Sequence, residues 1–409
     1  MLTLPFFRKS NAPIPLQVLS FVTAAVYSGI WCLRWSRNGV KGRLWPHLGW
    51  FTGFMCSGSL LGAVSWVARM QAISCWFQAN TASDTPHQSY TLVASSSRWL
   101  AVFTPSYGLE FLCFILLKLM LLGRLADNVK RCLQARAPEM SRIVLERCLG
   151  RSLLMLFKWM APPVLVCSLL GMVAFAVSGA YNLQQAGIFD QAAAACDVQG
   201  RDTNSSLALF NDALTCFKKA FKAASVQNSS EAVTLLLISL GYAVAVPLSV
   251  SIFRQAELVA ANALLSAAAR TEFSGSSSAS FNTRTVGAAT VVEDTMHAAA
   301  EQRQRLVVAC AIVLITFPAR AAYDFILAYA VFNVSFNPAC GICDTCQSTQ
   351  YLILQWLNYT PEFQPIVVAL SSPLPLTLSL WLITSAHARA VEVSLNLLRV
   401  RLGKDVFKR

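Results

Sequence analysis

Three cysteines stand close together in the stretch "NPACGICDTCQ", at Cys340, Cys343 and Cys346. Cys-x-x-Cys spacing suits a zinc site, a redox pair or a set of disulfides. A zinc site needs a fourth ligand, and none of the four histidines lies near this stretch: they are His47, His87, His297 and His387. Which chemistry applies depends on the side of a membrane on which the stretch lies, so the membrane-spanning segments must be identified first.

A second group of residues that could carry chemistry is charged and lies in apolar runs. Asp324 follows Arg320 by one helical turn in "FPARAAYDF", and Glu110 lies within the apolar run 99–123. Charged side chains are costly in hydrocarbon, so each marks either a functional site or a structural ion pair. Residues four apart share a helix face. Two interpretations stay open: Arg320 and Asp324 neutralise each other and lock the helices, or they form a ligand-binding pocket with Glu110 as its third member.

The composition indicates a membrane protein. Hydrophobic residues make up 55% of the 409 residues and charged residues 13%, against about a quarter charged in soluble domains. A span needs about 20 mainly apolar residues, and it must be helical because lipid offers the backbone no hydrogen-bond partners. The predicted spans are about 15–35, 49–77, 99–123, 153–178, 232–253, 306–332 and 365–388.

The predicted fold class is therefore all-α: a polytopic membrane protein with a seven-helix transmembrane bundle in residues 1–388. A cytoplasmic amphipathic helix and basic tail are expected at 389–409, and a flexible serine-rich loop at about 271–287. Glu110 and Asp324 are then the two acids inside the spans. Lys118, nearer a cytoplasmic end, is expected to extend its ammonium group to the interface.

The lysines and arginines predict the orientation. Of the 33, 22 lie in the connecting segments 34–48, 124–152, 254–305 and 389–409, and six in the segments of the other side. An excess of basic residues marks the cytoplasmic side, so the N-terminus is predicted outside and the C-terminus in the cytoplasm. The net charge of +13 belongs to these flanks, which attract membrane lipids. It forms no soluble basic face for nucleic acid.

Glycosylation sequons agree with this orientation. All four Asn-x-Ser/Thr sequons fall on the predicted outer side, at Asn204, Asn228, Asn333 and Asn358. Six of the 13 cysteines lie there too: Cys75, Cys196, Cys216, Cys340, Cys343 and Cys346. Because oxidising compartments favour disulfides, we expect these cysteines to form disulfides, with zinc ligation and free thiols as alternatives.

No catalytic pattern appears in the sequence. The histidines do not cluster as metal ligands, and there is no P-loop or dinucleotide-binding glycine motif. A retinal protein needs a Schiff-base lysine in its last helix, and 365–388 has none. We therefore expect no enzyme, cofactor or metal.

The layout as a whole resembles that of G-protein-coupled receptors: seven helices, an outer N-terminus, cysteines in the outer loops and a long third inner segment. Of the local motifs, "ITFPAR" matches the family's proline and preceding aromatic residue, whereas "GRLAD" and "SSPLP" differ from it. The resemblance implies signal transduction and a cytoplasmic, G-protein-like partner, in the plasma membrane or an endomembrane. A small-solute or ion transporter or channel is the alternative.

Overall fold

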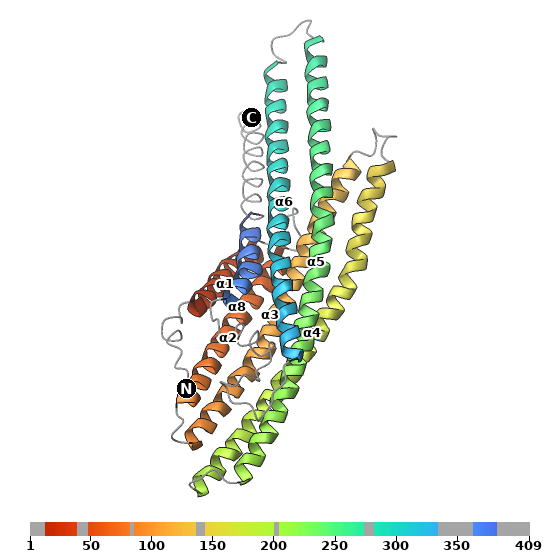
Figure 1. The fold of residues 1–409 in the computed structure, drawn as a ribbon. Coiled ribbons are helices and arrows are strands. Elements are labelled where there is room, and N and C mark those ends of the chain that lie inside the picture. Colours follow the sequence, from red (N-terminus) through yellow and green to blue (C-terminus); the bar gives the residue numbers. More distant parts are fainter. Residues whose placement is uncertain are drawn as a thin grey trace. The chain divides into compact units, whose positions relative to one another are not determined.

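The computed structural model describes residues 13–38, 48–81, 86–135, 144–199, 204–273, 282–333 and 363–382, and they form helices with no strand among them (Figure 1). The helices are α1 (Pro13–Asn38), α2 (Leu48–Thr81), α3 (Pro86–Ala135), α4 (Val144–Gln199), α5 (Asn204–Phe273), α6 (Asn282–Asn333) and α8 (Phe363–Ser371). A turn at Ser372 separates α8 from a further helical stretch, 373–382. The prediction of an all-helical chain is confirmed for these residues.

Four stretches within these helices are long and apolar enough to cross a membrane: Leu48–Ala79, Phe157–Cys196, Ala208–Ser251 and Gln304–Phe332. They lie in α2, α4, α5 and α6. Val18–Leu33 and Ile366–Leu382 are shorter apolar helices. The chain is thus a helical membrane protein, while the count of seven spans and the orientation of the termini stay predictions.

Several helices continue far beyond what a bilayer requires. α5 has 70 residues and α6 has 52. At 1.5 Å per residue α5 is ~105 Å long, against ~30 Å for the hydrocarbon core. Figure 1 shows both as continuous helices. The flexible loop predicted at about 271–287 is shorter than expected, because α6 already begins at Asn282. Residues 274–281 and the tail 389–409 lie outside the described residues.

The chain divides into two compact units. One unit comprises residues 1–119, 161–239 and 315–374, and the other 120–160, 240–314 and 375–409. Within the second unit, Tyr242 and Cys310 are fully buried, and Gly241 lies directly against the Met160 side chain. The charged residues singled out above all lie in the first unit.

Two glycines allow the first helices of the first unit to approach closely. A Cβ at Gly62 would overlap the Phe21 ring, and a Cβ at Gly58 would lie 2.9 Å from Cys113 Cβ. Small residues four apart are a common device for close contact between membrane helices. Here both glycines face neighbouring helices of the same chain, so they serve internal packing.

Candidate functional site: a buried charge cluster

Arg320 is the centre of a polar cluster inside the first unit. Its Nη2 donates hydrogen bonds to the Glu231 carboxylate on α5 and to the Tyr107 hydroxyl on α3. Its Nη1 donates to Ser371 Oγ at 3.3 Å, which brings in α8. The side chains of Arg320 and Glu231 are only 3% and 1% exposed. One guanidinium group therefore joins four helices.

Asp324 is a second, more distant partner of Arg320. Its Oδ2 lies 3.5 Å from Arg320 Nε, and both side chains are 3% exposed. The predicted pair one turn apart on α6 is confirmed. It is not self-contained, however, because Arg320 also binds Glu231 on another helix. Replacing Arg320 and Asp324 together would therefore still leave a buried acid without its arginine.

Glu231 was missed by the sequence analysis, and its position corrects the prediction of two intramembrane acids. The fifth span was drawn from residue 232, one residue too late to include it, whereas the apolar stretch of α5 is Ala208–Ser251. Glu231 contacts Arg320 and lies 3.4 Å from the Tyr107 hydroxyl. Glu231 and Arg320 both lie within apolar stretches long enough to cross a membrane. The overlooked signal was Gln227, four residues earlier on the same helix face.

Gln227 and Glu231 form a polar pair on α5. Gln227 Nε2 donates to Glu231 Oε2 at 2.8 Å. Gln227 is 2% exposed, and its amide oxygen is buried with no hydrogen-bond donor among the described residues. Polar groups buried in this way are costly, so Gln227 is better explained as part of the cluster than as a packing residue.

Glu110 lies one turn after Tyr107 on α3 and is 2% exposed. Its Oε2 is 3.2 Å from Ser65 Oγ on α2. The same Ser65 oxygen lies 2.9 Å from the carbonyl oxygen of Gly62. Arg320, Glu231 and Lys118 all act on Glu110 electrostatically. The structure thus places Glu110 within electrostatic reach of Arg320, while its membership of a ligand-binding pocket stays a prediction.

Lys118 does not reach the interface, and this prediction is wrong. It is 1% exposed, and its Nζ lies 4.0 Å from the centre of the Phe317 ring on α6. A lysine ammonium over an aromatic face is stabilised by the ring's quadrupole. The side chain therefore stays inside the protein, where it adds a second positive charge near the cluster.

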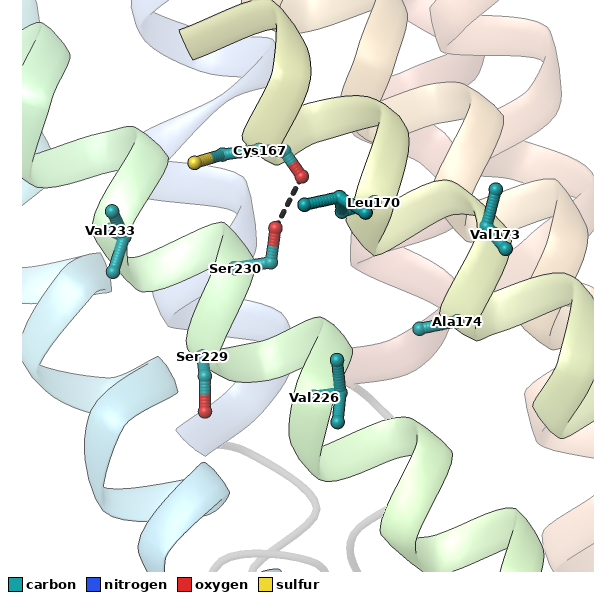
Figure 2. A pocket seen from close by; sticks show the side chains of 8 residues that line it. All are labelled: Cys167, Leu170, Val173, Ala174, Val226, Ser229, Ser230 and Val233. Carbon is teal, nitrogen blue, oxygen red and sulfur yellow. Dashed lines mark hydrogen bonds between the residues drawn. The ribbon is translucent and has the colours of Figure 1, made fainter. Parts of the chain in front are cut away.

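An apolar groove lies apart from these charges, between α4 and α5 (Figure 2). It has a volume of about 420 Å³ and is lined by Cys167, Leu170, Val173, Ala174, Val226, Ser229, Ser230 and Val233. Figure 2 shows the Ser230 hydroxyl donating to the Cys167 carbonyl oxygen, which satisfies that hydroxyl within the helix pair. Leu170, Val226 and Val233 are all at least partly exposed. These side chains suit contact with lipid tails better than recognition of a polar ligand.

The disulfide candidates are only partly described. Cys75, Cys196 and Cys216 are free thiols, while Cys340, Cys343 and Cys346 lie outside the described residues. Cys196 is three residues before the end of α4 and Cys216 twelve residues after the start of α5. Side by side in a hairpin, the two would differ in height by ~13 Å, too far for a disulfide. Disulfides that involve the 340–346 cysteines therefore stay a prediction.

The sequons have different surroundings. Asn228 is 9% exposed in the middle of α5, three residues before Glu231, which leaves no room for a glycan. Asn204 is the first residue of α5 and Asn333 the last residue of α6; Asn358 lies outside the described residues. Of the two sequons that the sequence analysis placed farthest from the spans, Asn204 stays a predicted acceptor and Asn228 does not.

No group of three or more His, Cys, Asp or Glu side chains within the described ranges could hold a metal ion. Comparison with known proteins adds no further assignment. No family model, no curated protein and no solved structure matches the chain.

Proposed function

We propose that this chain is a receptor-like integral membrane protein that transmits a signal across the bilayer by breaking and re-forming the Arg320 cluster. The observation that carries the proposal is the attachment of one α6 guanidinium to Glu231 on α5 and Tyr107 on α3, in a cluster that is almost wholly buried. An arginine that joins α6 to α5, α3 and α8 gives these helices one favoured arrangement. A ligand or partner that competes for Arg320 would favour another.

The proline next to the cluster supports movement of α6. Pro318 lies inside α6, two residues before Arg320. Proline removes a backbone hydrogen bond and is a common cause of helix kinks. α6 can therefore bend beside the residue that holds it to α5 and α3.

The long extensions of α5 and α6 would carry a movement at the cluster to the predicted cytoplasmic side. Both helices continue, without a break in the described residues, past residues 253 and 306 to the ends that flank 274–281. The distribution of basic residues predicts that these ends are cytoplasmic. We expect a G-protein-like signalling partner to bind the ends of these two helices at the plasma membrane and to respond to their movement.

The distance between the two extensions tests the proposal. Spin labels at positions 268 and 289, in a background without reactive cysteines, would be measured in lipid nanodiscs. Arg320→Leu/Glu231→Leu removes the ion pair between α5 and α6 without leaving either charge of that pair behind. We expect it to shift or broaden the distance distribution, whereas Arg98→Ala, which breaks an exposed ion pair elsewhere, should not. Identical distributions in all three proteins would contradict the proposal.

Ion-coupled transport is the second candidate. The observation in its favour is that three acids and two cations lie buried together, because such groups also mark ion pathways in carriers. Proteoliposomes that contain the purified protein separate the two candidates. An ion or solute flux that Glu231→Gln abolishes, with unchanged label distances, would favour transport.

A further inference from the structure

The apolar groove between α4 and α5 lies in the part of both helices that can cross a membrane. Its walls belong to the apolar stretches Phe157–Cys196 and Ala208–Ser251. Leu170 on one wall and Val226 on the other are each 57% exposed (Figure 2). Exposed apolar side chains at this place meet lipid acyl chains, which are as apolar as leucine. The groove is therefore open to hydrocarbon.

The two helices are in direct contact at the groove. The Ser230 hydroxyl donates to the Cys167 carbonyl oxygen (Figure 2). A Cβ at Gly171 would lie 3.3 Å from Ser230 Oγ and 3.9 Å from the Gln227 carbonyl oxygen, so the glycine allows this close approach. The groove is thus a depression on a packed helix pair.

Three exposed lysines precede the groove on α5: Lys218, Lys219 and Lys222. Lys219 and Lys222 lie seven and four residues before Val226, and this spacing puts them on the face of α5 that lines the groove. Lys222 is ~6 Å from Val226 along the helix axis. Among the described residues, Lys218 and Lys222 form no ion pair. Positive charge that no described acid neutralises therefore lies directly beyond one end of the groove.

The wall formed by α4 leads to the same lysines. Tyr181 lies seven residues after Ala174, which lines the groove, and so shares its helix face. Lys219 Nζ lies 5.7 Å from the centre of the Tyr181 ring. Lysine extends its ammonium group to the membrane interface, and tyrosine is enriched there. The contact between Lys219 and Tyr181 thus marks the level of the lipid headgroups, with the groove deeper in the hydrocarbon.

We propose that this groove binds one acidic phospholipid, with an acyl chain between α4 and α5 and its phosphate on Lys219 and Lys222. Charge complementarity favours this occupant, because the groove has no charged lining residue and its end beyond Val226 is cationic. A sterol would fill the apolar part and leave the lysines without an anion. The inference does not rest on the proposed function, since none of these residues belongs to the Arg320 cluster.

Native mass spectrometry of the full-length protein tests the lysines. The protein is released from nanodiscs that contain phosphatidylglycerol and phosphatidylcholine of equal chain length in equal amounts. We expect the wild type to retain one phosphatidylglycerol in preference to phosphatidylcholine. Lys219→Gln/Lys222→Gln should weaken that binding about tenfold or more. The control Arg98→Gln/Lys158→Gln, which removes two exposed cations elsewhere, should retain it. A wild type without bound phosphatidylglycerol, or an equal loss in the control, would overturn the proposal.

Blocking the groove tests the acyl chain separately. Val226→Trp fills the groove and keeps both lysines, so it should also lose the lipid, whereas Val244→Trp, at another exposed valine of α5, should keep it. Glycerol 3-phosphate, a headgroup without chains, should not displace the bound lipid. Lipid retained by Val226→Trp, or displaced by glycerol 3-phosphate, would contradict a chain in the groove. So would a wild-type dimer that Val226→Trp dissociates without loss of lipid, because a second copy would then occupy the groove.

Discussion

Two arginine–acid pairs in this protein have the same chemistry in opposite surroundings. Arg320 and Glu231 join α6 to α5 with side chains 3% and 1% exposed, whereas Arg98 and Asp190 join α3 to α4 with side chains 53% and 42% exposed. The buried arginine also binds Tyr107 and Ser371. The exposed pair lies outside the cluster, near Ser97 and Gln185.

The difference shows that surroundings decide what an ion pair does. An exposed pair is screened by water and salt and typically contributes about 0–1 kcal/mol. In a buried pair the loss of one partner leaves the other charge uncompensated, at a cost of about 3–5 kcal/mol. A buried pair is thus a poor source of net stability but a strong constraint on which helices lie together.

Replacement of the arginine should have the largest effect. Arg320→Leu removes the cation nearest to Glu231 and Asp324, and we expect it to lower the free energy of unfolding by about 3–5 kcal/mol. Reversible unfolding in mixed detergent micelles measures this. If Arg320→Leu lowered the free energy of unfolding by less than about 1 kcal/mol, the buried pair would contribute no more than the exposed pair.

Removal of the acids should separate the close partner from the distant one. Glu231→Leu leaves Arg320 with Asp324 at 3.5 Å, and we expect a loss of about 3 kcal/mol. Asp324→Leu leaves the closer Glu231 contact intact and should cost less, about 1–2 kcal/mol. The same unfolding assay decides the order, and a larger loss for Asp324→Leu would reverse our assignment of the partners.

Sequence alone found the members of this cluster that lie inside an obvious apolar run. Arg320 and Asp324 are one turn apart within such a run, and helical spacing brings them together. Glu231 was left out of the predicted fifth span because the end of an apolar run is most easily placed next to a charged residue. Lys118 was misplaced because its partner, the Phe317 ring, comes from a different helix. Contacts between helices, unlike spacing along one helix, depend on packing that a single sequence does not display.

Loss of the tyrosine hydroxyl should have an intermediate effect. Tyr107→Phe keeps the ring packed 5.4 Å from Phe175 and removes the oxygen that accepts from Arg320. Hydrogen bonds to charged groups contribute about 1.5–3 kcal/mol, and we expect a loss in that range. Phe175→Leu, which changes the packing and keeps the hydroxyl, is the control for the ring contact.

The exposed pair should respond least. Arg98→Ala is expected to change the free energy of unfolding by less than about 1 kcal/mol, with a difference from wild type that shrinks as salt is added. Thermal melts at low and high ionic strength measure both features. A salt-independent loss of several kcal/mol would mean that Arg98 is shielded from solvent.

Two double variants test the central claim, that Arg320 is bound chiefly by Glu231 across helices and not by Asp324 on its own helix. Arg320→Leu/Glu231→Leu removes the close pair and leaves only the more distant acid, Asp324, without its arginine. Its unfolding free energy should therefore recover by about 1–3 kcal/mol relative to Arg320→Leu, since apolar replacement of both partners is often tolerated. Arg320→Leu/Asp324→Leu leaves Glu231 buried without its arginine and should remain the less stable of the two. Greater recovery in Arg320→Leu/Asp324→Leu would contradict the claim and return the site to a self-contained pair on α6.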